Sequence, residues 1–371
     1  MKICLIGGIY KKGGSRKDFI DISPETVLEA GLRSAGHEVT ALSHYDDGSF
    51  DPFDVVHVHH LSWGATRLAS DPSRVPFVFT AHDTTRMCGF SQPFTRRAAM
   101  RYVFSRADAA VALSGLEADF QRGAYRLGGA LHATIPNGID ADLYSFKREN
   151  SAGQDQPWKL LFVGQLTPQK RVDLLLKALP LLHPDIELTL VYQNVALENE
   201  LKTLAEALDV SRRVHFLGKR NPAQLAALYH ASDLLVLPSA WEALPSVISE
   251  AMLCGLPFVA SATGGIPEQA NGFGVLLEKR NETELAKAIL RVLTHYEEFA
   301  RTSQAMATQA RERFAIPKMI ERHLDLYRRV TAAAKVPRRH ALRYAALNAA
   351  VRQALRWHSG ASVPRQAVAR T

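Results

Sequence analysis

The chain has 371 residues with a formal net charge of +8, and its composition is ordinary for a folded soluble protein. At roughly 150 residues per domain, this length predicts two domains, each able to bury its own core. The three cysteines (Cys4, Cys88 and Cys254) have no disulfide or metal-ligand spacing, which favours a reducing cytoplasm. No uncharged apolar run reaches about 18 residues, and the N-terminal run is too short for a signal peptide, so neither a membrane span nor a leader is expected.

Short apolar runs alternate with helical patterns in the first part of the chain. Helix start signals, an N-cap followed by proline, stand at Ser23 and Pro24, before a helical pattern at 23–35. Strands are expected at 2–7, 39–42, 55–59, 77–81, 109–113 and 133–135. The runs are mostly continuous rather than alternating, as is typical of parallel strands buried on both faces.

The polar segment KRENSAGQDQP at 147–157 resembles a linker, after which the same rhythm resumes. A helical pattern covers 172–182, and strands are expected at 159–164, 187–192, 214–218, 234–238, 257–261 and 274–277. This order predicts an α/β fold with two doubly wound sheets of similar size. Ligands bind at the carboxyl ends of such strands, so two facing sheets would form a cleft between domains.

The most informative segment is SAWEALPSVISEAMLCGLPFVASATGGIPE at 239–268. Glu242 and Glu250 flank Pro245, which marks the start of a short apolar helix, so Glu242 is expected in a loop and Glu250 inside the helix. Backbone N–H groups at a helix start attract phosphate, whereas carboxylates accept hydrogen bonds from hydroxyls. A nucleotide sugar has this order of groups, with phosphates between two sets of hydroxyls.

Three further motifs have a functional and a structural interpretation. Lys170 and Arg171 follow Gly164 at a turn into a helix, where they would neutralise a diphosphate or simply be solvated cations. Gly13 and Gly14 follow the first strand in a loop that would cradle phosphate or serve as a flexible turn. His82 ends the fourth expected strand, where a histidine contacts a substrate or has a structural role. The run HVHH at 57–60 has no nearby carboxylate or cysteine cluster, so no metal site is expected.

Together these segments resemble the large retaining glycosyltransferase family four, which has the GT-B architecture. The resemblance covers roughly residues 1–330. It depends on VGQLTPQKRVD at 163–173, FLGKR at 216–220, LYHASDLLVLPSAWEALPSVISEAM at 228–252 and GLPFVASATGGIPE at 255–268. In the first half it depends on GGS at 13–15, HVHH at 57–60, HD at 82–83 and IPNGID at 135–140.

The resemblance implies a domain organisation. Two Rossmann-like domains would face each other across a cleft: an acceptor-binding domain at 1–150 and a nucleotide-sugar-binding domain at 151–315. A closing helix at 316–333 would return to the first domain, and a basic tail would follow at 334–371.

The resemblance also implies roles for individual residues. Lys170 would contact the donor diphosphate, Glu242 the hydroxyls of the transferred sugar, and Glu250 the ribose. Three backbone N–H groups would lie near sugar and phosphate, those of Ala243, Leu244 and Ser246. The base would lie beside Gly218 and Lys219. His82 would stand close to the reacting sugar, and Gly13 and Gly14 would form the phosphate loop of the first domain.

Two positions depart from the family pattern. Gln165 stands directly after Gly164, where members often have arginine, so the diphosphate site loses one charge. We expect Arg171 to compensate in part. Ala243 follows Glu242 where many members have glycine, and we expect little consequence from so small a side chain.

The resemblance further implies a retaining, front-face mechanism. An oxocarbenium-like species would form beside the leaving diphosphate, which would itself accept the proton of the acceptor. Catalysis would come from holding both substrates together and neutralising the leaving group. No protein nucleophile, cofactor or metal is then expected, in keeping with the lack of a convincing DxD-like triplet.

The C-terminal segment carries the excess positive charge. From 331 to 371 there are eight lysines and arginines and no acidic residue, which leaves residues 1–330 formally neutral. If 338–357 is helical, it has one apolar stripe and a basic face, which favours either an anionic membrane surface or docking on the protein body. The stretch TRRAAMRYVFSR at 95–106 is also basic. These features suggest a lipid-linked or glycan acceptor and a cytoplasmic enzyme at the inner face of the membrane.

Other functions compete with this interpretation. A sugar-phosphate synthase or phosphorylase of the same architecture would use a soluble acceptor, and a sugar-nucleotide epimerase would need none. A dinucleotide-dependent oxidoreductase is disfavoured because there is no GxGxxG motif. Nucleic-acid binding through the tail is not expected, since the tail has few interleaved aromatic residues. Donor base, donor sugar, acceptor and linkage are left open by the sequence.

Overall fold

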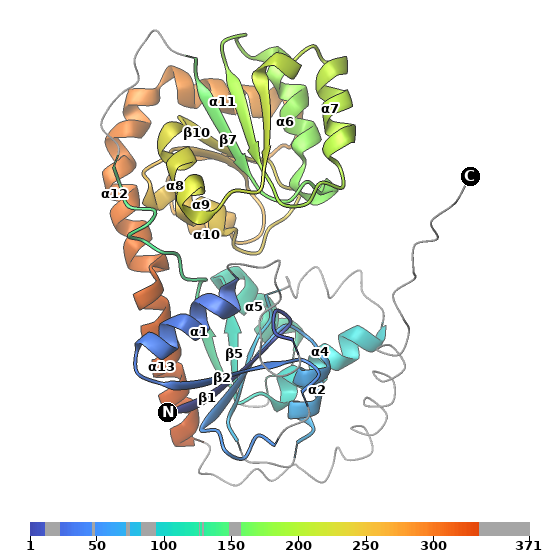
Figure 1. Cartoon of the computed structure of the whole chain (residues 1–371), viewed down its shortest axis with the longest axis vertical. Coiled ribbons are helices and arrows are strands. Elements are labelled where there is room, and N and C mark those ends of the chain that lie inside the picture. The colour runs from blue at the N-terminus through green and yellow to red at the C-terminus, as the bar shows by residue number, and fades with distance from the viewer. Residues whose placement is uncertain are drawn as a thin grey trace, which may run out of the picture. The chain divides into compact units, whose positions relative to one another are not determined.

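The computed structural model describes residues 1–11, 23–46, 49–71, 75–82, 94–125, 127, 130–147 and 157–333. Two six-stranded parallel sheets organise these residues, with helices packed on them (Figure 1). The chain divides into two compact units, which we describe one at a time. The fold is the expected α/β architecture with two doubly wound sheets. The expected amphipathic tail helix at 338–357 and the glycine loop at 12–15 lie outside the described residues.

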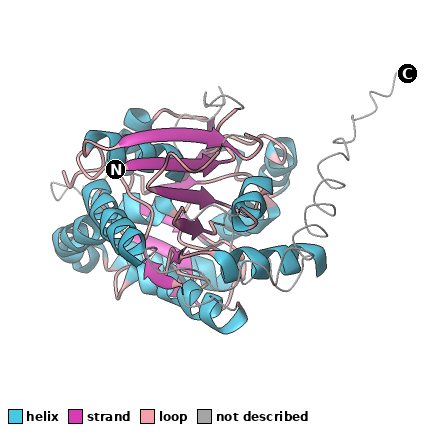
Figure 2. Cartoon of the chain, turned by 90° about the horizontal axis from the view of Figure 1, so that it is seen from below, coloured by secondary structure: helices cyan, strands magenta, loops and turns pink. Residues whose placement is uncertain are grey.

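The first unit comprises residues 1–112, 118–135 and 320–371. Its sheet has the strand order β2-β1-β3-β4-β5-β6. The strands are β1 (Lys2–Gly7), β2 (Glu38–Ser43), β3 (Val55–His59), β4 (Phe77–Thr80), β5 (Ala109–Ala112) and β6 (Leu131–Thr134). The helices are α1 (Pro24–Ser34), α2 (Trp63–Ala69), α4 (Phe94–Arg106), α5 (Gly115–Ala124) and the greater part of α13 (Ile316–Ala333). In Figure 2 the strands, in magenta, have cyan helices on either side.

The second unit comprises residues 113–117 and 136–319, and its sheet has the order β12-β11-β10-β7-β8-β9. The strands are β7 (Lys159–Val163), β8 (Glu187–Val191), β9 (Val214–Gly218), β10 (Leu234–Leu237), β11 (Phe258–Ser261) and β12 (Val275–Leu277). The helices are α6 (Val172–Ala178), α7 (Glu198–Ala207), α8 (Pro222–Ala231), α9 (Ser246–Leu253), α10 (Ile266–Ala270), α11 (Glu282–Thr294) and α12 (Tyr296–Phe314). Three short 3-10 helices complete it, η1 (Pro168–Lys170), η2 (Leu179–Leu181) and η3 (Ser211–Arg213).

Each expected strand is present, with ends that differ by at most two residues at either terminus. Central strands such as β3, β4 and β10 are buried at each position, which explains why their sequences are mostly apolar. The polar exceptions, which have hydrogen-bond partners within the first unit, are His57, His59 and Thr80. The helix expected from Ser23 begins as predicted: the Ser23 hydroxyl accepts from Thr26 N, and Pro24 is the first helical residue. The pattern at 172–182 divides into α6 and η2, because Pro180 cannot donate to the helical ladder.

Residues 113–117 already belong to the second unit, and the chain enters it again at Pro136, before the expected boundary at 150. The reason is packing within that unit. Ile139 forms a parallel bridge with Ala315, and Ile139 and Tyr144 are buried in the core of the second unit. The second unit ends at Met319, later than the expected 315, because α13 belongs to the first unit from Ile320 onward. The polar segment therefore does not coincide with the point where the chain changes unit.

Candidate functional site

In each sheet the order of the strands reverses at one place, and the predicted site residues follow the strands on either side of that place. In the second unit the order runs outward from β7 through β8 and β9, and outward from β10 through β11 and β12. The loops after β7 and β10 therefore leave neighbouring strands in diverging directions. In open α/β sheets this switch point, outside the carboxyl ends of the strands, is where ligands bind. The loop after β7 contains Lys170, and the loop after β10 contains Glu242.

The loops after β7 and β10 meet at an ion pair. Lys170 Nζ lies 2.5 Å from Glu242 Oε1, and the two side chains are only 17% and 8% exposed. Two hydrogen bonds also hold the loops together. Between backbone atoms, Gln169 O accepts from Ala240 N at 2.7 Å, and the Gln169 side chain donates from Nε2 to Trp241 O at 3.0 Å. The structure thus brings together a cation and a carboxylate that lie 72 residues apart in the sequence. Such a pair can exchange partners with a ligand that offers both an anion and hydroxyl groups.

Two glycines hold the backbone that carries Glu242. A Cβ at Gly264, which has φ +56°, would lie 1.6 Å from Glu242 O, and one at Gly265 would lie 2.3 Å from Ala243 O. Gly265 N also donates to Ala243 O at 2.9 Å. The loop at 262–265 can therefore approach the glutamate loop closely only because both positions lack a side chain. This contact fixes the position from which Glu242 projects.

Helix α9 begins directly after the glutamate loop. Pro245 is its N-cap, one residue earlier than the expected first helical position, and no side chain caps the helix. Ile248 N donates to Pro245 O at 3.2 Å, so the N–H groups left to an anion at this helix start are those of Ser246 and Val247. Ser246 and Ala243 are half-buried, and Leu244 is buried. Glu242 lies in the loop and Glu250 in the helix, as expected.

Glu250 is held by a buried tyrosine. Tyr229, on α8, donates from its hydroxyl to Glu250 Oε2 at 2.7 Å. Burial raises the pKa of Glu250 to about 7, although the hydrogen bond from Tyr229 acts in the opposite direction. Near neutral pH this carboxyl therefore exists in both protonation states, and ligands that donate hydrogen bonds favour its ionised form.

The other predicted donor residues lie at the same edge of this sheet. Gly164 follows β7, and a Cβ there would lie 3.1 Å from the Phe162 ring. Gln165 is exposed, and so is Lys219, which follows Gly218 at the end of β9. Gly218 has φ +67°, a conformation that favours glycine. The edge thus presents strand ends from β7, β9 and β10.

The Arg171 side chain is paired with an acidic residue of its own segment. It adopts a left-handed conformation (φ 53°) between η1 and α6, and its Nε donates to Asp173 Oδ1 at 3.2 Å. The expected compensation for Gln165 would require Arg171 to turn from this acid toward the diphosphate.

Histidines gather at the switch point of the first unit. The sheet reverses between β1 and β3, and His59 and His60 stand at the end of β3. His59 Nδ1 lies 2.7 Å from His82 Nε2, so the strand-end histidine after β4 is hydrogen-bonded rather than isolated. His60 Nε2 lies 3.4 Å from Glu25 Oε1. Gly13 and Gly14 would follow β1 at this same point but lie outside the described residues.

The buried members of this group are neutral at neutral pH. Burial lowers the pKa of His57 and His59 well below the usual value, and nearby histidines lower it further. His57 is fully enclosed: its Nδ1 lies 2.6 Å from the Tyr327 hydroxyl and its Nε2 lies 2.7 Å from Thr80 Oγ1. Burial alone would raise the pKa of Glu25, but the hydrogen bond with His60 brings it below its usual value. Within the described part of the chain, no three potential ligands are grouped as a metal site.

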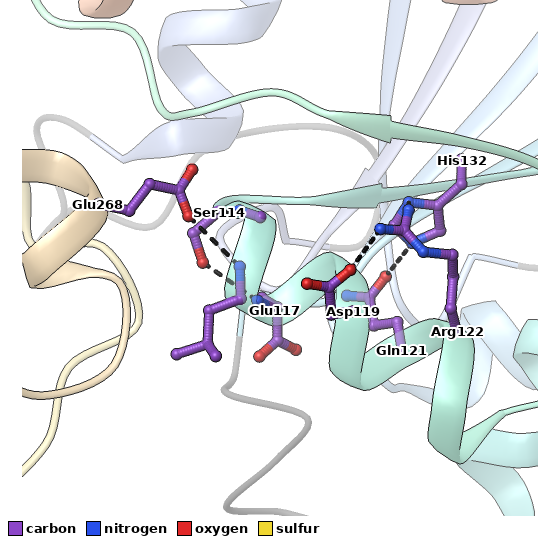
Figure 3. A network of polar contacts seen from close by, with 9 residues as sticks. Ser114, Glu117, Asp119, Gln121, Arg122, His132 and Glu268 are labelled. Atoms are coloured by element: carbon purple, nitrogen blue, oxygen red, sulfur yellow. Dashed lines mark hydrogen bonds and ion pairs between the residues drawn. The ribbon is translucent and has the colours of Figure 1, made fainter.

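A further carboxylate of the GGIPE motif contacts the start of α5, whose first residues belong to the second unit. Glu268 Oε2 accepts from Gly115 N at 2.7 Å and from Leu116 N at 3.3 Å (Figure 3). Ser114 Oγ accepts from Glu117 N in the same turn. The carboxylate of Glu268 thus accepts hydrogen bonds at the N-terminus of α5, where the helix dipole is positive. Farther along α5, Arg122 contacts Asp119, and His132 of β6 contacts Gln121.

Sequence reasoning did not single out Tyr229, Glu268 or the glycine pair. Tyr229 reads as one more apolar residue of a short helix, and its partner Glu250 is 21 residues away. Gly264 and Gly265 belong to the segment GLPFVASATGGIPE at 255–268. Two glycines after a buried strand indicate a close backbone approach, so the sequence did carry a signal for this contact.

Comparison with known proteins agrees with this architecture. The family described as Glycosyl transferases group 1 matches residues 145–313, and Glycosyltransferase Family 4 matches residues 45–143. Similar curated proteins include D-inositol 3-phosphate glycosyltransferases from Corynebacterium jeikeium (30% identical, 64% of this chain) and Mycolicibacterium smegmatis (31% identical, 70% of this chain). The chain spans 63% of the length of each of these relatives.

Solved structures share the fold at lower identity. A sucrose-phosphate synthase from Thermosynechococcus elongatus superposes with a TM-score of 0.76 at 20% identity, covering 90% of this chain and 99% of that one. HepE from Anabaena, in complex with UDP, gives 0.70 at 22% identity, covering 88% and 99%. With twelve parallel strands in two doubly wound sheets and matches to both family descriptions, the chain belongs to the group 1, family-four glycosyltransferases of GT-B fold.

Proposed function

We propose that the protein is a retaining hexosyltransferase that moves a sugar from a nucleotide-sugar donor to a glycan or lipid-linked acceptor, in cell-surface polysaccharide or glycolipid biosynthesis. The observation that carries this proposal is the Lys170–Glu242 pair beside the uncapped start of α9, with Glu250 eight residues farther on. A nucleotide sugar complements this order of groups. The complexes of HepE with UDP and with UDP-glucose support a donor of this class.

In the proposed mechanism Lys170 leaves Glu242 and contacts the diphosphate, while Glu242 accepts hydrogen bonds from the sugar. The first-turn N–H groups of α9 stabilise the same diphosphate as negative charge develops on it. The bond from the anomeric carbon to the diphosphate breaks as the acceptor hydroxyl attacks from the same face. A diphosphate oxygen takes the acceptor proton, so no protein nucleophile is needed. His82 stands near the reacting sugar, where its ring is oriented by His59.

A soluble phosphorylated acceptor is the second candidate. It is favoured by the names of the relatives, D-inositol 3-phosphate glycosyltransferase and sucrose-phosphate synthase, which both refer to phosphorylated products or acceptors. The two candidates differ in the acceptor alone, so they share the donor site described above.

The donor is tested by thermal unfolding with UDP-, GDP- and ADP-sugars. A donor that binds only the folded state raises its stability by about 2.7 kcal/mol at a concentration one hundred times its Kd. Transfer is then measured with lipid-linked glycans and with inositol and hexose phosphates, and the anomeric configuration of the product is read by NMR. Failure of all three donor classes to stabilise the protein would contradict the proposal, and an inverted product would contradict the mechanism.

The mechanism assigns charge neutralisation to Lys170 and backbone N–H groups, so it requires no metal. The rate of transfer should therefore stay the same after chelation with EDTA and after Mg²⁺ is added back. A loss of activity that Mg²⁺ restores would show that a cation contributes to the diphosphate site.

A cytoplasmic enzyme at an anionic membrane surface would meet a lipid-linked acceptor there. No helix in the described parts of the chain is long and apolar enough to span a bilayer. Flotation with anionic liposomes, comparing the full chain with one that ends at Ala332, tests whether the basic tail is the anchor. Equal flotation of both would assign membrane binding elsewhere or exclude it.

A further inference from the structure

Tyr229 is a fully enclosed polar side chain next to the candidate donor site. It lies on α8 and has 0% of its surface exposed. Its hydroxyl donates to Glu250 Oε2 at 2.7 Å and lies 3.3 Å from Val247 O, so both contacts are to α9. A buried tyrosine could occupy this place as an apolar ring alone, yet its hydroxyl is directed at the one carboxylate of α9.

The other titratable groups around Glu250 do not replace this contact. Tyr144, from the segment after β6, packs edge to face on the Tyr229 ring with 5.7 Å between centroids. Cys254 follows the end of α9, and its Sγ lies 3.6 Å from the Tyr144 carbonyl. Burial raises the pKa of Tyr229 well above its usual value, with the carboxylate of Glu250 adding to the effect, and Tyr144 is shifted in the same direction. Both tyrosines therefore stay protonated, and only Tyr229 donates to Glu250 among the described residues.

We propose that Tyr229 is a positioning residue for nucleotide binding: its hydroxyl fixes Oε2 of Glu250 and leaves Oε1 to accept hydrogen bonds from the ribose. This inference rests on the proposed function, in which Glu250 faces the ribose of the donor. A carboxylate that rotates about its last torsion would lose part of each ribose contact, because hydrogen bonds weaken steeply with angle. Tyr229 also favours the ionised carboxylate, which accepts from two hydroxyls at once.

The test compares Tyr229→Phe with the unchanged protein by calorimetric titration with two probes, UDP and 2′,3′-dideoxy-UDP. If loss of the hydroxyl raises the pKa of Glu250 by about 1, the ionised fraction at pH 7 falls about fivefold, and UDP affinity falls with it. The dideoxy probe lacks the ribose hydroxyls, so its affinity should not change. Tyr144→Phe is the matched control, since it removes a hydroxyl from the same aromatic pair without touching the hydrogen bond to Glu250.

The pH profile separates the two ways in which Tyr229 acts on Glu250. In Tyr229→Phe the part of the UDP affinity loss that comes from protonation of Glu250 should disappear between pH 7 and pH 9, where Glu250 is ionised in either protein, and the part that comes from rotation of the carboxylate should remain. In a Glu250→Ala background the same substitution should have no further effect on UDP binding. Equal weakening of both probes would overturn the proposal and leave Tyr229 a packing residue. If UDP, GDP and ADP all fail to bind the unchanged protein, the proposed function itself falls.

Discussion

Glu242 and Lys170 neutralise each other across the loops after β7 and β10. Under the proposed function, Glu242→Gln replaces the sugar-binding carboxylate with a neutral amide and leaves the ammonium of Lys170 without its counter-charge. We expect transfer to fall by about a hundredfold or more, as is typical when a group that acts on the transition state is lost. Binding of UDP, which lacks the transferred sugar, should become tighter or stay unchanged. Steady-state kinetics and calorimetry measure the two effects separately, and weaker UDP binding in this variant would contradict the exchange of partners.

Lys170→Ala should have the opposite effect on UDP. It removes a charge-assisted contact to the diphosphate of roughly 1.5–3 kcal/mol, about a tenfold to hundredfold loss of affinity. Lys177→Ala is a suitable control because Lys177 is a half-exposed lysine of the following helix that pairs with Asp173. The prediction is wrong if both lysine variants bind UDP equally well.

Gly264 and Gly265 provide a test of the support behind Glu242. Gly264→Ala adds a methyl group 1.6 Å from a backbone oxygen and demands a left-handed conformation, so the glutamate loop must move. We expect a loss of about 1–3 kcal/mol in unfolding free energy and a large fall in transfer. Gly272→Ala is the matched control, since Gly272 also has a positive φ (+90°) but nothing within 4 Å of its added Cβ. Chemical denaturation and transfer assays should show a loss of stability in both variants but a loss of transfer in Gly264→Ala alone.

At the level of elements, the start of α5 depends on an acid from α10. Glu268→Ala leaves two first-turn N–H groups without their carboxylate, which should cost about 1 kcal/mol of unfolding free energy. Glu268→Gln should cost less, because the amide oxygen still accepts a hydrogen bond but carries no charge. Denaturation midpoints of both variants, with the exposed Glu278→Ala as control, would show this order. Identical midpoints for all three would mean that the contact contributes nothing to stability.

Elements were also the level at which sequence reasoning was most accurate. The short, mostly apolar runs of β3 and β10 favour buried parallel strands, and Ser23-Pro24 marks a helix start with two independent signals. Pro245 gave the start of α9 to within one residue. The change of unit at Pro136 was missed because it depends on packing of Ile139 and Tyr144 against residues far along the chain.

At the level of the whole molecule, the two units should respond to acid in opposite ways. His57 and His59 have lowered pKa values in the folded state, so the unfolded chain binds more protons below about pH 6.5, and stability is lost as pH falls. Glu250 has a raised pKa of about 7, so the folded chain binds more protons between about pH 4.5 and 7, and stability is gained as pH falls. Between pH 7.5 and 5.5 the Glu250 effect is about 2 kcal/mol, and it opposes the effect of the histidines.

Glu250→Gln removes one side of this balance. Its unfolding free energy should fall more steeply with acid than that of the unchanged protein, by about 2 kcal/mol between pH 7.5 and 5.5. Urea denaturation at several pH values measures the slopes. Parallel slopes for the two proteins would show that Glu250 titrates near its ordinary value.

The site as a whole was only partly accessible from sequence. The motif predicted residues that the fold brings together, since Gly164, Lys170, Glu242 and Glu250 all fall at one edge of one sheet. It could not give the Lys170–Glu242 pair, the inward turn of Tyr229 or the His59–His82 contact, because each joins residues from separate strands or helices. Local periodicity carries no information on such pairs.

The ion pair at the switch point also bears on discrimination. An inorganic phosphate ion that drew Lys170 to itself would leave a nearly buried carboxylate without its cation, at a cost that a small anion has no means of offsetting. Under the proposed function, a nucleotide sugar brings the replacement with it, since its hydroxyls satisfy Glu242 while its diphosphate satisfies the lysine. Glu242, which has the same sign as simple anions, therefore disfavours them at the switch point, and binding requires a molecule that carries both chemistries at once.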